Sequence, residues 1–359
     1  MTSHRIFRVL AGVGSAALVL APAAHGATKT VSLGLPPAAQ GQFQAASADA
    51  DAFFPDTITV HAGDSVKFVP DGFHNVDLPA KGGKPTPLIG PSGGNVSGAK
   101  DAAGTPFWFD GKVPNIGFDP SLFKSAFGKS FSYTGAKGVQ SGLPLSNHPK
   151  PLTIRFPKAG SFTYFCDVHA GMKGTVKVVA KKKPVPSAKV DRDVVRKQVV
   201  KALAVAKGLA TTKPAANSVS LGASGPGGVE VLAMLPDSLT VPVGTTVSFA
   251  MPVGSREDHT ATFAPGDPEK QPTSYIGQLA GSFNGPAPDP RAVYASDPPG
   301  APAVLNPTAH GNGFWNSGVL DQVAASPLAP SNSVKFDTAG TYTYYCLIHP
   351  FMKGTVKVQ

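Results

Sequence analysis

The chain has 359 residues, of which 42% are hydrophobic and only 15% charged, and its formal net charge is +10. Its 40 glycines and 36 prolines exceed what a mainly helical protein tolerates, so we expect short strands joined by many turns, and the length allows two domains. The positive charge is not accompanied by a basic face interleaved with aromatic residues, which argues against nucleic acid as a partner.

The first 27 residues have the pattern of an export signal. Arg5 and Arg8 precede an apolar run over residues 9–20, and small residues offer cleavage after Ala23 or Gly26. A membrane anchor is the less favoured alternative, because a spanning helix needs about 20 apolar residues. The sequence therefore predicts a signal peptide over residues 1–27 and a secreted mature protein, either extracellular or in the periplasm or cell envelope.

The remainder of the chain contains an internal duplication. Residues 54–68 recur as residues 235–249, and both copies alternate β-branched and polar residues around a central glycine, as a hairpin of half-buried strands does. Residues 159–166 recur as residues 339–346 near the end of each copy. The duplication predicts two all-β domains, residues 28–182 and residues 215–359.

A basic linker, residues 183–214, is expected between the two copies. Residues 181–213 carry 10 basic and 2 acidic side chains, a net charge of 10 − 2 = +8. Ser187 can cap a helix over residues 188–209, where Val190, Val194, Val195, Val199 and Leu203 form a partial apolar stripe. This helix is predicted to be a solvated spacer with one face resting on a domain. Weak contact with an anionic membrane or cell wall is the alternative.

Each copy also has a Gly/Pro-rich insertion before its last strands, over residues 88–149 and residues 265–327. The insertions carry related aromatic pairs, Phe107–Trp108 and Phe314–Trp315. These rings could shape a docking surface for a partner. The favoured interpretation is a small core that holds a long loop in place.

The candidate chemistry is concentrated in a motif that occurs once in each copy. The spacing Cys-x-x-His-x-x-Met is formed by Cys166, His169 and Met172, and again by Cys346, His349 and Met352. A thiolate, two imidazoles and a weak axial thioether are the ligands of a mononuclear copper site that transfers electrons. The second imidazole must come from elsewhere, and the candidates are His74 and His259, the latter displaced by four extra residues.

A disulfide is the alternative role for the two cysteines, which are the only cysteines of the chain. A bridge between Cys166 and Cys346 gives no reason for a histidine and a methionine at the same spacing in both copies. The pattern favours metal.

These residues resemble the cupredoxin family of plastocyanin/azurin-like blue copper proteins. The sequence His349-Pro350-Phe351-Met352 is similar to the ligand loop of amicyanin, and His74-Asn75-Val76 is similar to the upstream motif of plastocyanin and amicyanin. The resemblance implies two Greek-key antiparallel β-sandwich domains and one type 1 (blue) copper in each, two per chain, cycling between Cu(I) and Cu(II). It implies the ligand sets His74, Cys166, His169, Met172 and His259, Cys346, His349, Met352.

Further expectations follow from the same resemblance. The loop histidines, His169 and His349, are expected to be the surface ports for electrons. Thr260 stands where the family usually has Asn, so an outer hydrogen bond of the second site is expected to differ.

An enzyme is the main alternative, because two cupredoxin domains also occur in copper nitrite reductases and two-domain oxidases. Those enzymes need further histidines, commonly one directly before the cysteine, where this chain has Phe165 and Tyr345. The remaining histidines of the mature chain, His61, His148 and His310, are scattered in the sequence. The favoured prediction is a non-enzymatic electron carrier with transient redox protein partners. A copper-scavenging or delivery protein is the second alternative.

Overall fold

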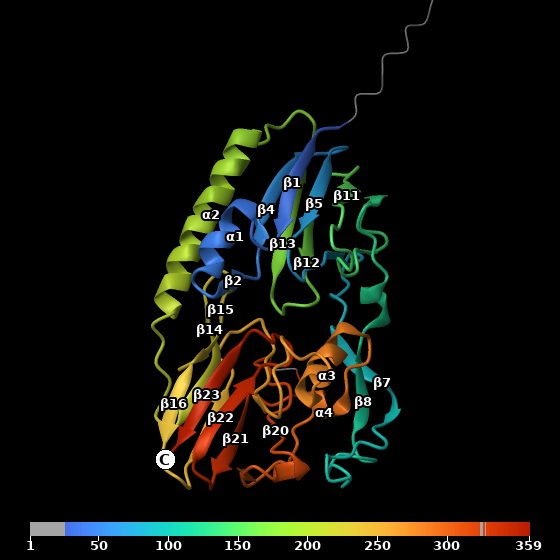
Figure 1. Cartoon of the computed structure of the whole chain (residues 1–359). Helices are drawn as coiled ribbons and strands as arrows, with labels where there is room; N and C mark the ends of the chain where they lie inside the picture. The colour runs from blue at the N-terminus through green and yellow to red at the C-terminus, as the bar shows by residue number, and fades with distance from the viewer. Residues whose placement is uncertain (1–25, 324–325, 327) are drawn as a thin grey trace, which may run out of the picture.

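The computed structural model describes residues 26–323, 326 and 328–359. The predicted signal peptide lies outside the described residues, apart from its last two positions. Figure 1 shows two β-rich halves stacked end to end, the first in blue to green and the second in yellow to red. None of the helices in the described ranges is both long enough and apolar enough to cross a membrane.

The first half contains two five-stranded sheets. One sheet has the order β3 (Phe53–Phe54), β1 (Thr28–Leu33), β5 (Ser65–Pro70), β11 (Leu152–Arg155), β9 (Ser130–Ser132). The other has the order β10 (Val139–Gln140), β6 (Asp77–Leu78), β12 (Gly160–Phe165), β13 (Lys173–Val179), β4 (Thr57–His61). Alternating side chains from both sheets form one buried core that includes Val31, Phe68, Val76 and Tyr164.

The second half repeats this arrangement. One sheet has the order β19 (Ala303–Leu305), β21 (Ser331–Phe336), β17 (Thr246–Ala250), β14 (Ser218–Gly225), β15 (Val229–Leu235), β2 (Ala48–Ala50). The other has the order β16 (Ser238–Val241), β23 (Lys353–Val358), β22 (Gly340–Tyr345), β18 (Thr262–Phe263), β20 (Trp315–Asn316). The all-β fold class is confirmed. The sheets are mixed rather than purely antiparallel, since β1–β5, β4–β13, β14–β17 and β16–β23 are parallel pairs.

The repeated segment at the start of each copy is not a hairpin, which corrects the prediction. Its two strands alternate in burial as expected, but β4 pairs with β13 in one sheet and β5 pairs with β1 and β11 in the other. The backbone amides of the turn between them donate hydrogen bonds to other segments, from Ala62 to the Val179 carbonyl and from Gly63 to the Phe156 carbonyl. The segment therefore crosses from one layer to the other, and both layers use its buried side chains.

The remaining elements are short, except for one helix. They are β7 (Ile89–Asn95), β8 (Pro114–Phe118), α1 (Pro37–Gln44), α3 (Tyr275–Gly281), α4 (Pro290–Val293) and three 3₁₀ turns (Pro120–Phe123, Ser282–Asn284, Ala309–Gly311). The long helix is α2 (Ala188–Leu209), where the sequence predicted it, capped by Ser187. In Figure 1 it runs along one side of the molecule.

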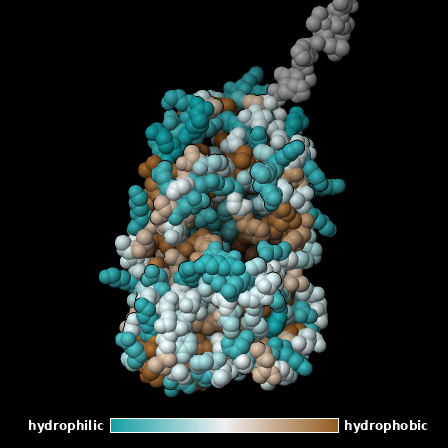
Figure 2. Space-filling view, in the orientation of Figure 1, coloured by the Kyte–Doolittle hydropathy of each residue, from teal (hydrophilic) through white to brown (hydrophobic). Residues whose placement is uncertain are grey.

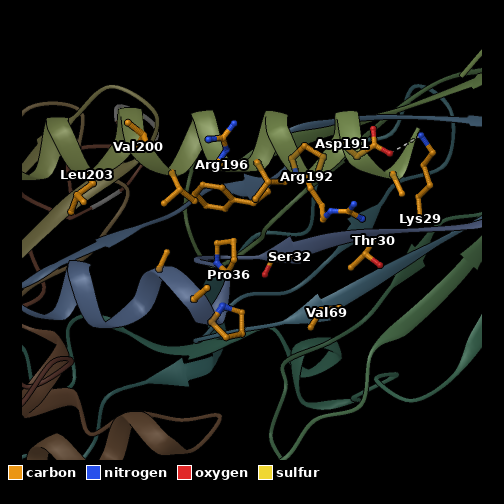
Figure 3. A pocket seen from close by; sticks show the side chains of 18 of the residues that line it. Lys29, Thr30, Ser32, Pro36, Val69, Asp191, Arg192, Arg196, Val200 and Leu203 are labelled. Atoms are coloured by element: carbon orange, nitrogen blue, oxygen red, sulfur yellow. Dashed lines mark ion pairs between the residues drawn. The ribbon is translucent and has the colours of Figure 1, made fainter. Parts of the chain in front are cut away.

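One face of α2 rests on both halves, where the spacer interpretation expected contact with one domain. Ala202 and Ala206 are buried in a core shared with α1, β2, β14 and β15, whereas Val190, Val194 and Val200 stay exposed. Lys29 and Asp191 form an ion pair of 2.7 Å near the start of the helix. Figure 3 shows this pair at one end of a groove of about 840 Å³ between α2 and the β1–α1 segment.

The first half contributes segments to the second half. Strand β2, from the first half, pairs with β15 and so forms the edge of a sheet in the second half. The insertion that carries β7 and β8 reaches the second half, where Phe107 packs against Phe314 with ring centroids 5.9 Å apart. The Trp108 indole donates to the carbonyl of Ala295 at 2.9 Å. The insertions thus form a joint core, rather than one core each.

Candidate metal centres

The first site lies at the end of the β12–β13 hairpin. Cys166 follows β12 and Met172 precedes β13, and the loop is closed by two backbone hydrogen bonds of 3.0 Å, from Cys166 N to Met172 O and from Met172 N to His169 O. His74 comes from the connection between β5 and β6. The Sγ atom of Cys166 lies 3.6 Å from Nδ1 of His169 and 3.9 Å from Nδ1 of His74. The structure therefore brings together residues that are 92 positions apart.

The second site repeats this geometry at the end of the β22–β23 hairpin. The Sγ atom of Cys346 lies 3.6 Å from Nδ1 of His259 and 3.9 Å from Nδ1 of His349. The two Nδ1 atoms are only 3.1 Å apart. The four extra residues before His259 do not displace it from the site.

These donor atoms fit a soft metal ion. Two ligands at about 2.0 Å (imidazole) and 2.3 Å (thiolate) from one ion, the lengths known for zinc, lie about 3.7 Å apart when the bond angle is 120°. The observed separations of 3.6 and 3.9 Å match this value in both sites. In the second site two imidazole nitrogens face each other at 3.1 Å, an arrangement that a proton or a cation between them stabilises.

The methionine of each motif lies near its cysteine in the fold. Met172 is buried in the same core as Cys166, and Met352 in the same core as Cys346. Because each loop is closed by a hydrogen bond from the methionine amide, the methionine is fixed beside the cysteine and the loop histidine. Each half thus brings one thiol and two imidazoles together and carries a methionine on the same loop, and these residue types suit a type 1 copper.

The disulfide alternative does not hold in the structure. Both thiols are free and buried. Each of them faces the two histidines of its own half.

Burial sets the protonation of the donors. It raises the pKa of the Cys166 thiol to about 12 and that of Cys346 to about 11. It lowers the pKa of His74 and of His349 to about 4. The imidazoles are therefore neutral at pH 7 with a lone pair free for a metal, and a bound cation would have to displace the thiol protons.

The position after each upstream histidine fixes the ligand loop. The Asn75 carbonyl oxygen accepts from the Asp167 amide at 2.7 Å, and its amide group donates to the Asp167 carboxylate at 2.7 Å. In the second site the Thr260 hydroxyl oxygen accepts from the Leu347 amide at 2.8 Å. Both sites keep a bond to the amide of the residue after the cysteine. The second bond of Asn75 goes to the Asp167 side chain, whereas the Thr260 hydroxyl contacts that of Thr262 at 3.0 Å.

Only one of the two loop histidines keeps a sizeable exposed surface. His169 is 6% exposed and so does not reach the surface as the resemblance implied, whereas the His349 side chain is 20% exposed. Both face the junction between the two halves, because the hairpin ends that carry them are directed at each other's half. Phe351, beside His349, is exposed by 52%.

The three remaining histidines of the mature chain lie apart from both sites. His61 contacts the carbonyl of Lys183 at 2.8 Å, and His148 is exposed on a loop. His310 lies between Asp101 and Asp297, at 3.5 and 3.3 Å, and so joins the two insertions. In the described part of the chain they form no shared cluster with one another.

Two acidic residues at the junction were missed by the sequence analysis. Oδ1 of Asp51 lies 3.9 Å from Nδ1 of His169, and the Glu257 carboxylate lies between the two loop histidines. Glu257 is one of the extra residues that precede His259, so a charged insertion next to a candidate ligand could have drawn attention to it. No sequence pattern marks Asp51, because its position near His169 depends on a contact between distant segments.

Comparisons with known proteins found similarity to copper proteins in parts of the chain. Residues 322–359 match the family model of copper binding proteins, plastocyanin/azurin family. Amicyanin-alpha of Methylorubrum extorquens is 42% identical over 53 residues, which are 14% of this chain and 44% of that protein, so the match spans less than half of the relative.

Solved structures of the same kind are also similar to parts of the chain. Amicyanin from Paracoccus versutus is 18% identical over 42% of this chain and 88% of its own, with a TM-score of 0.22. The oxidized form of plastocyanin from Dryopteris crassirhizoma is 23% identical over 40% of this chain and 99% of its own, with a TM-score of 0.21.

Proposed function

We propose that this chain, a member of the plastocyanin/azurin-like cupredoxins, is an exported electron carrier that holds one type 1 copper in each half. The observation that carries the proposal is the repeated approach of one thiol to two imidazole Nδ1 atoms, at 3.6 and 3.9 Å in both halves. The second half is supported by the family match as well. For the first half the support is this geometry alone.

The protein's contribution is a donor set that is already assembled and excluded from water. In each half three donors come from one short loop closed by backbone hydrogen bonds, and the fourth is held by a separate connection between the sheets. Copper bound there would supply a one-electron Cu(I)/Cu(II) couple. Because buried strands hold the donors, their positions change little between the two charge states, which keeps the reorganisation during electron transfer small.

The backbone around each thiol favours its charged form. The Thr260 and His349 amides donate to the Cys346 sulfur at 3.4 and 3.3 Å. Backbone amides next to each thiol lower its pKa against the larger effect of burial. Such amides also draw electron density from a metal-bound thiolate. They are the part of the chain that would set the two potentials.

The direct test is metal analysis and an optical spectrum of the mature protein with each cysteine replaced in turn. We expect two coppers per chain and an intense thiolate-to-copper band. Cys166→Ser and Cys346→Ser should each lose one copper and that site's share of the band, and each variant serves as the control for the other. A protein that binds fewer than two coppers, or binds them without the band, contradicts the proposal.

The same preparation separates the alternatives. Reversible one-electron oxidation and reduction of both sites supports a carrier, and copper that is bound but cannot be cycled indicates scavenging or delivery. Turnover of nitrite or oxygen would indicate an oxidoreductase. Detection of the mature chain outside the cytoplasm, with residues 1–27 removed, tests export.

A further inference from the structure

The junction between the halves contains a carboxylate that contacts both loop histidines. Oε1 of Glu257 lies 3.4 Å from Nε2 of His169, and Oε2 lies 3.5 Å from Nε2 of His349. Glu257 is 8% exposed and His169 is 6% exposed, so this contact is largely shielded from water. A single side chain therefore touches the outer edge of a candidate ligand in each half.

The orientation of the two imidazole rings connects the two candidate sites through Glu257. In each half the Nδ1 atom faces the thiol, at 3.6 Å for His169 and 3.9 Å for His349, so Nε2 is the atom on the far side of the ring. A metal on Nδ1 leaves Nε2 as an N–H group, which can donate only to an acceptor. The Glu257 carboxylate offers one oxygen to each ring.

From this arrangement we propose that the two copper sites exchange electrons within one chain, through His169, Glu257 and His349. The proposal rests on the proposed function, since it requires both sites to hold copper. One electron passes from the reduced site, which is oxidised from Cu(I) to Cu(II), to the oxidised site, which is reduced from Cu(II) to Cu(I). No bond is made or broken, and the first electron comes from an external one-electron donor.

Glu257 has one oxygen for each ring and so orients both N–H groups toward one point. Burial and the neighbouring carboxylates of Glu230, Asp49 and Asp258 raise the pKa of Glu257. Two cupric sites with one thiolate ligand each carry a net positive charge, which opposes this shift and favours the ionised carboxylate. Glu257 is thus a positioning residue, which acts through the two histidines.

The junction is held by contacts on every side of Glu257. The Ser255 hydroxyl accepts from the Glu257 amide at 3.1 Å, and the Arg256 guanidinium reaches across to the Asp51 carbonyl. The Asp51 amide donates to the carbonyl of Gly228 at 2.7 Å, next to the β2–β15 pairing. These bonds tie the two halves together next to Glu257, the residue that contacts both loop histidines.

A cavity gives small molecules access to the same junction. It measures about 420 Å³ and is lined by Glu257 and both loop histidines together with apolar side chains such as Phe73, Ile116 and Ile348. Figure 2 shows apolar surface at mid-height on the face in view, at the level where the halves meet in Figure 1. An external donor can thus reach the pair through this cavity, which both loop histidines line.

The first experiment measures the proximity of the two sites. In the doubly oxidised wild-type protein, the two Cu(II) centres should broaden each other's electron paramagnetic resonance lines. The Cys166→Ser and Cys346→Ser variants, with one copper each, should give narrow lines. Two bound coppers whose spectrum equals the sum of the single-site spectra would overturn the inference, whereas failure to bind two coppers would instead overturn the proposed function.

The second experiment measures electron exchange itself. After reduction by less than one electron per chain with a flash-generated small-molecule reductant, the electron should redistribute between the sites at a rate independent of protein concentration. We expect Glu257→Leu to slow this first-order rate by about tenfold or more, the scale of losing a charge-assisted contact, and Glu257→Gln to slow it less. A rate proportional to protein concentration in the wild type would overturn the inference.

The matched control is Glu269→Gln, at an exposed glutamate of the same half. It removes the same charge without touching either histidine and should leave the rate unchanged. In every variant the two thiolate-to-copper bands must persist, which shows that the donor sets are intact. If Glu257→Leu with both bands present redistributes the electron at the wild-type rate, Glu257 has no part in the exchange.

Discussion

The two candidate sites differ in which histidine lies nearer to the thiol. Cys166 lies nearer to its loop histidine and Cys346 nearer to its upstream histidine, with the same two distances, 3.6 and 3.9 Å, exchanged. The surroundings differ more: Asn75 makes two hydrogen bonds to Asp167 where Thr260 makes one to Leu347, and Asp51 lies near His169 only. The sandwich with its hairpin loop thus determines the donor geometry, while neighbouring polar groups distinguish the two sites.

The largest effect on stability should come from a glycine that occupies the equivalent position in each half, Gly174 and Gly354. A Cβ atom on Gly174 would lie 2.3 Å from the ring of Tyr164, and one on Gly354 would lie 2.3 Å from the hydroxyl oxygen of Tyr344. Both tyrosines are buried and cannot move aside. We expect Gly174→Ala and Gly354→Ala each to lower the free energy of unfolding by about 1–3 kcal/mol, as overpacking does.

Chemical denaturation of the two variants measures this effect. Gly208→Ala is the control, since a Cβ at that helical position meets nothing within 4 Å and should stabilise the helix by about 0.5–1 kcal/mol. A loss in one half but not in the other would show that the two cores are less alike than their sequences.

A smaller effect is expected at the residues that hold the ligand loops. Asn75→Ala leaves the buried Asp167 amide without its acceptor, and Thr260→Val likewise takes the acceptor from the Leu347 amide and removes the hydroxyl contact with Thr262. Each should lower the free energy of unfolding by about 1–2 kcal/mol. Each variant should also release copper faster from its own site. Thermal unfolding and transfer of copper to a chelator measure the two effects, and equal release from both sites would contradict a local role.

The smallest expected effect concerns pH and the contact between the insertions. Burial lowers the pKa of His310, but hydrogen bonds and charges from Asp297 and Asp101 outweigh it and raise the pKa overall. A raised pKa in the folded state means that the charged form stabilises the fold. The contribution is complete below the unfolded pKa of about 6.5 and is lost as the pH rises through the folded value.

His310→Asn tests this contribution. Because the ring is partly exposed, we expect a difference below about 1 kcal/mol between the variant and the wild type, present at pH 5.5 and absent at pH 8.5. Urea unfolding at the two pH values measures it. A difference that grows as the pH rises would show that the carboxylates do not govern this histidine.

The donor sets could be predicted from the sequence because their signals are local and occur twice. A cysteine, a histidine and a methionine within seven residues define a loop, and a strand repeat placed the upstream histidine. The pairing of β2 with β15 and the meeting of Phe107 with Phe314 could not be predicted, because no periodicity links these segments. For the same reason Glu257 was passed over: only the approach of the two halves shows what it contacts.

Because strand β2 of the first half forms the edge of a sheet in the second half, the second half is incomplete when it is produced alone. Cutting the chain within the α2 helix would remove Ala48–Ala50 from the sheet whose edge it covers and leave β15 with unpaired backbone groups. Such an open edge invites self-association. A usable fragment of the C-terminal module would therefore need this short peptide supplied in trans or grafted on, which makes the protein less modular than its duplicated sequence suggests.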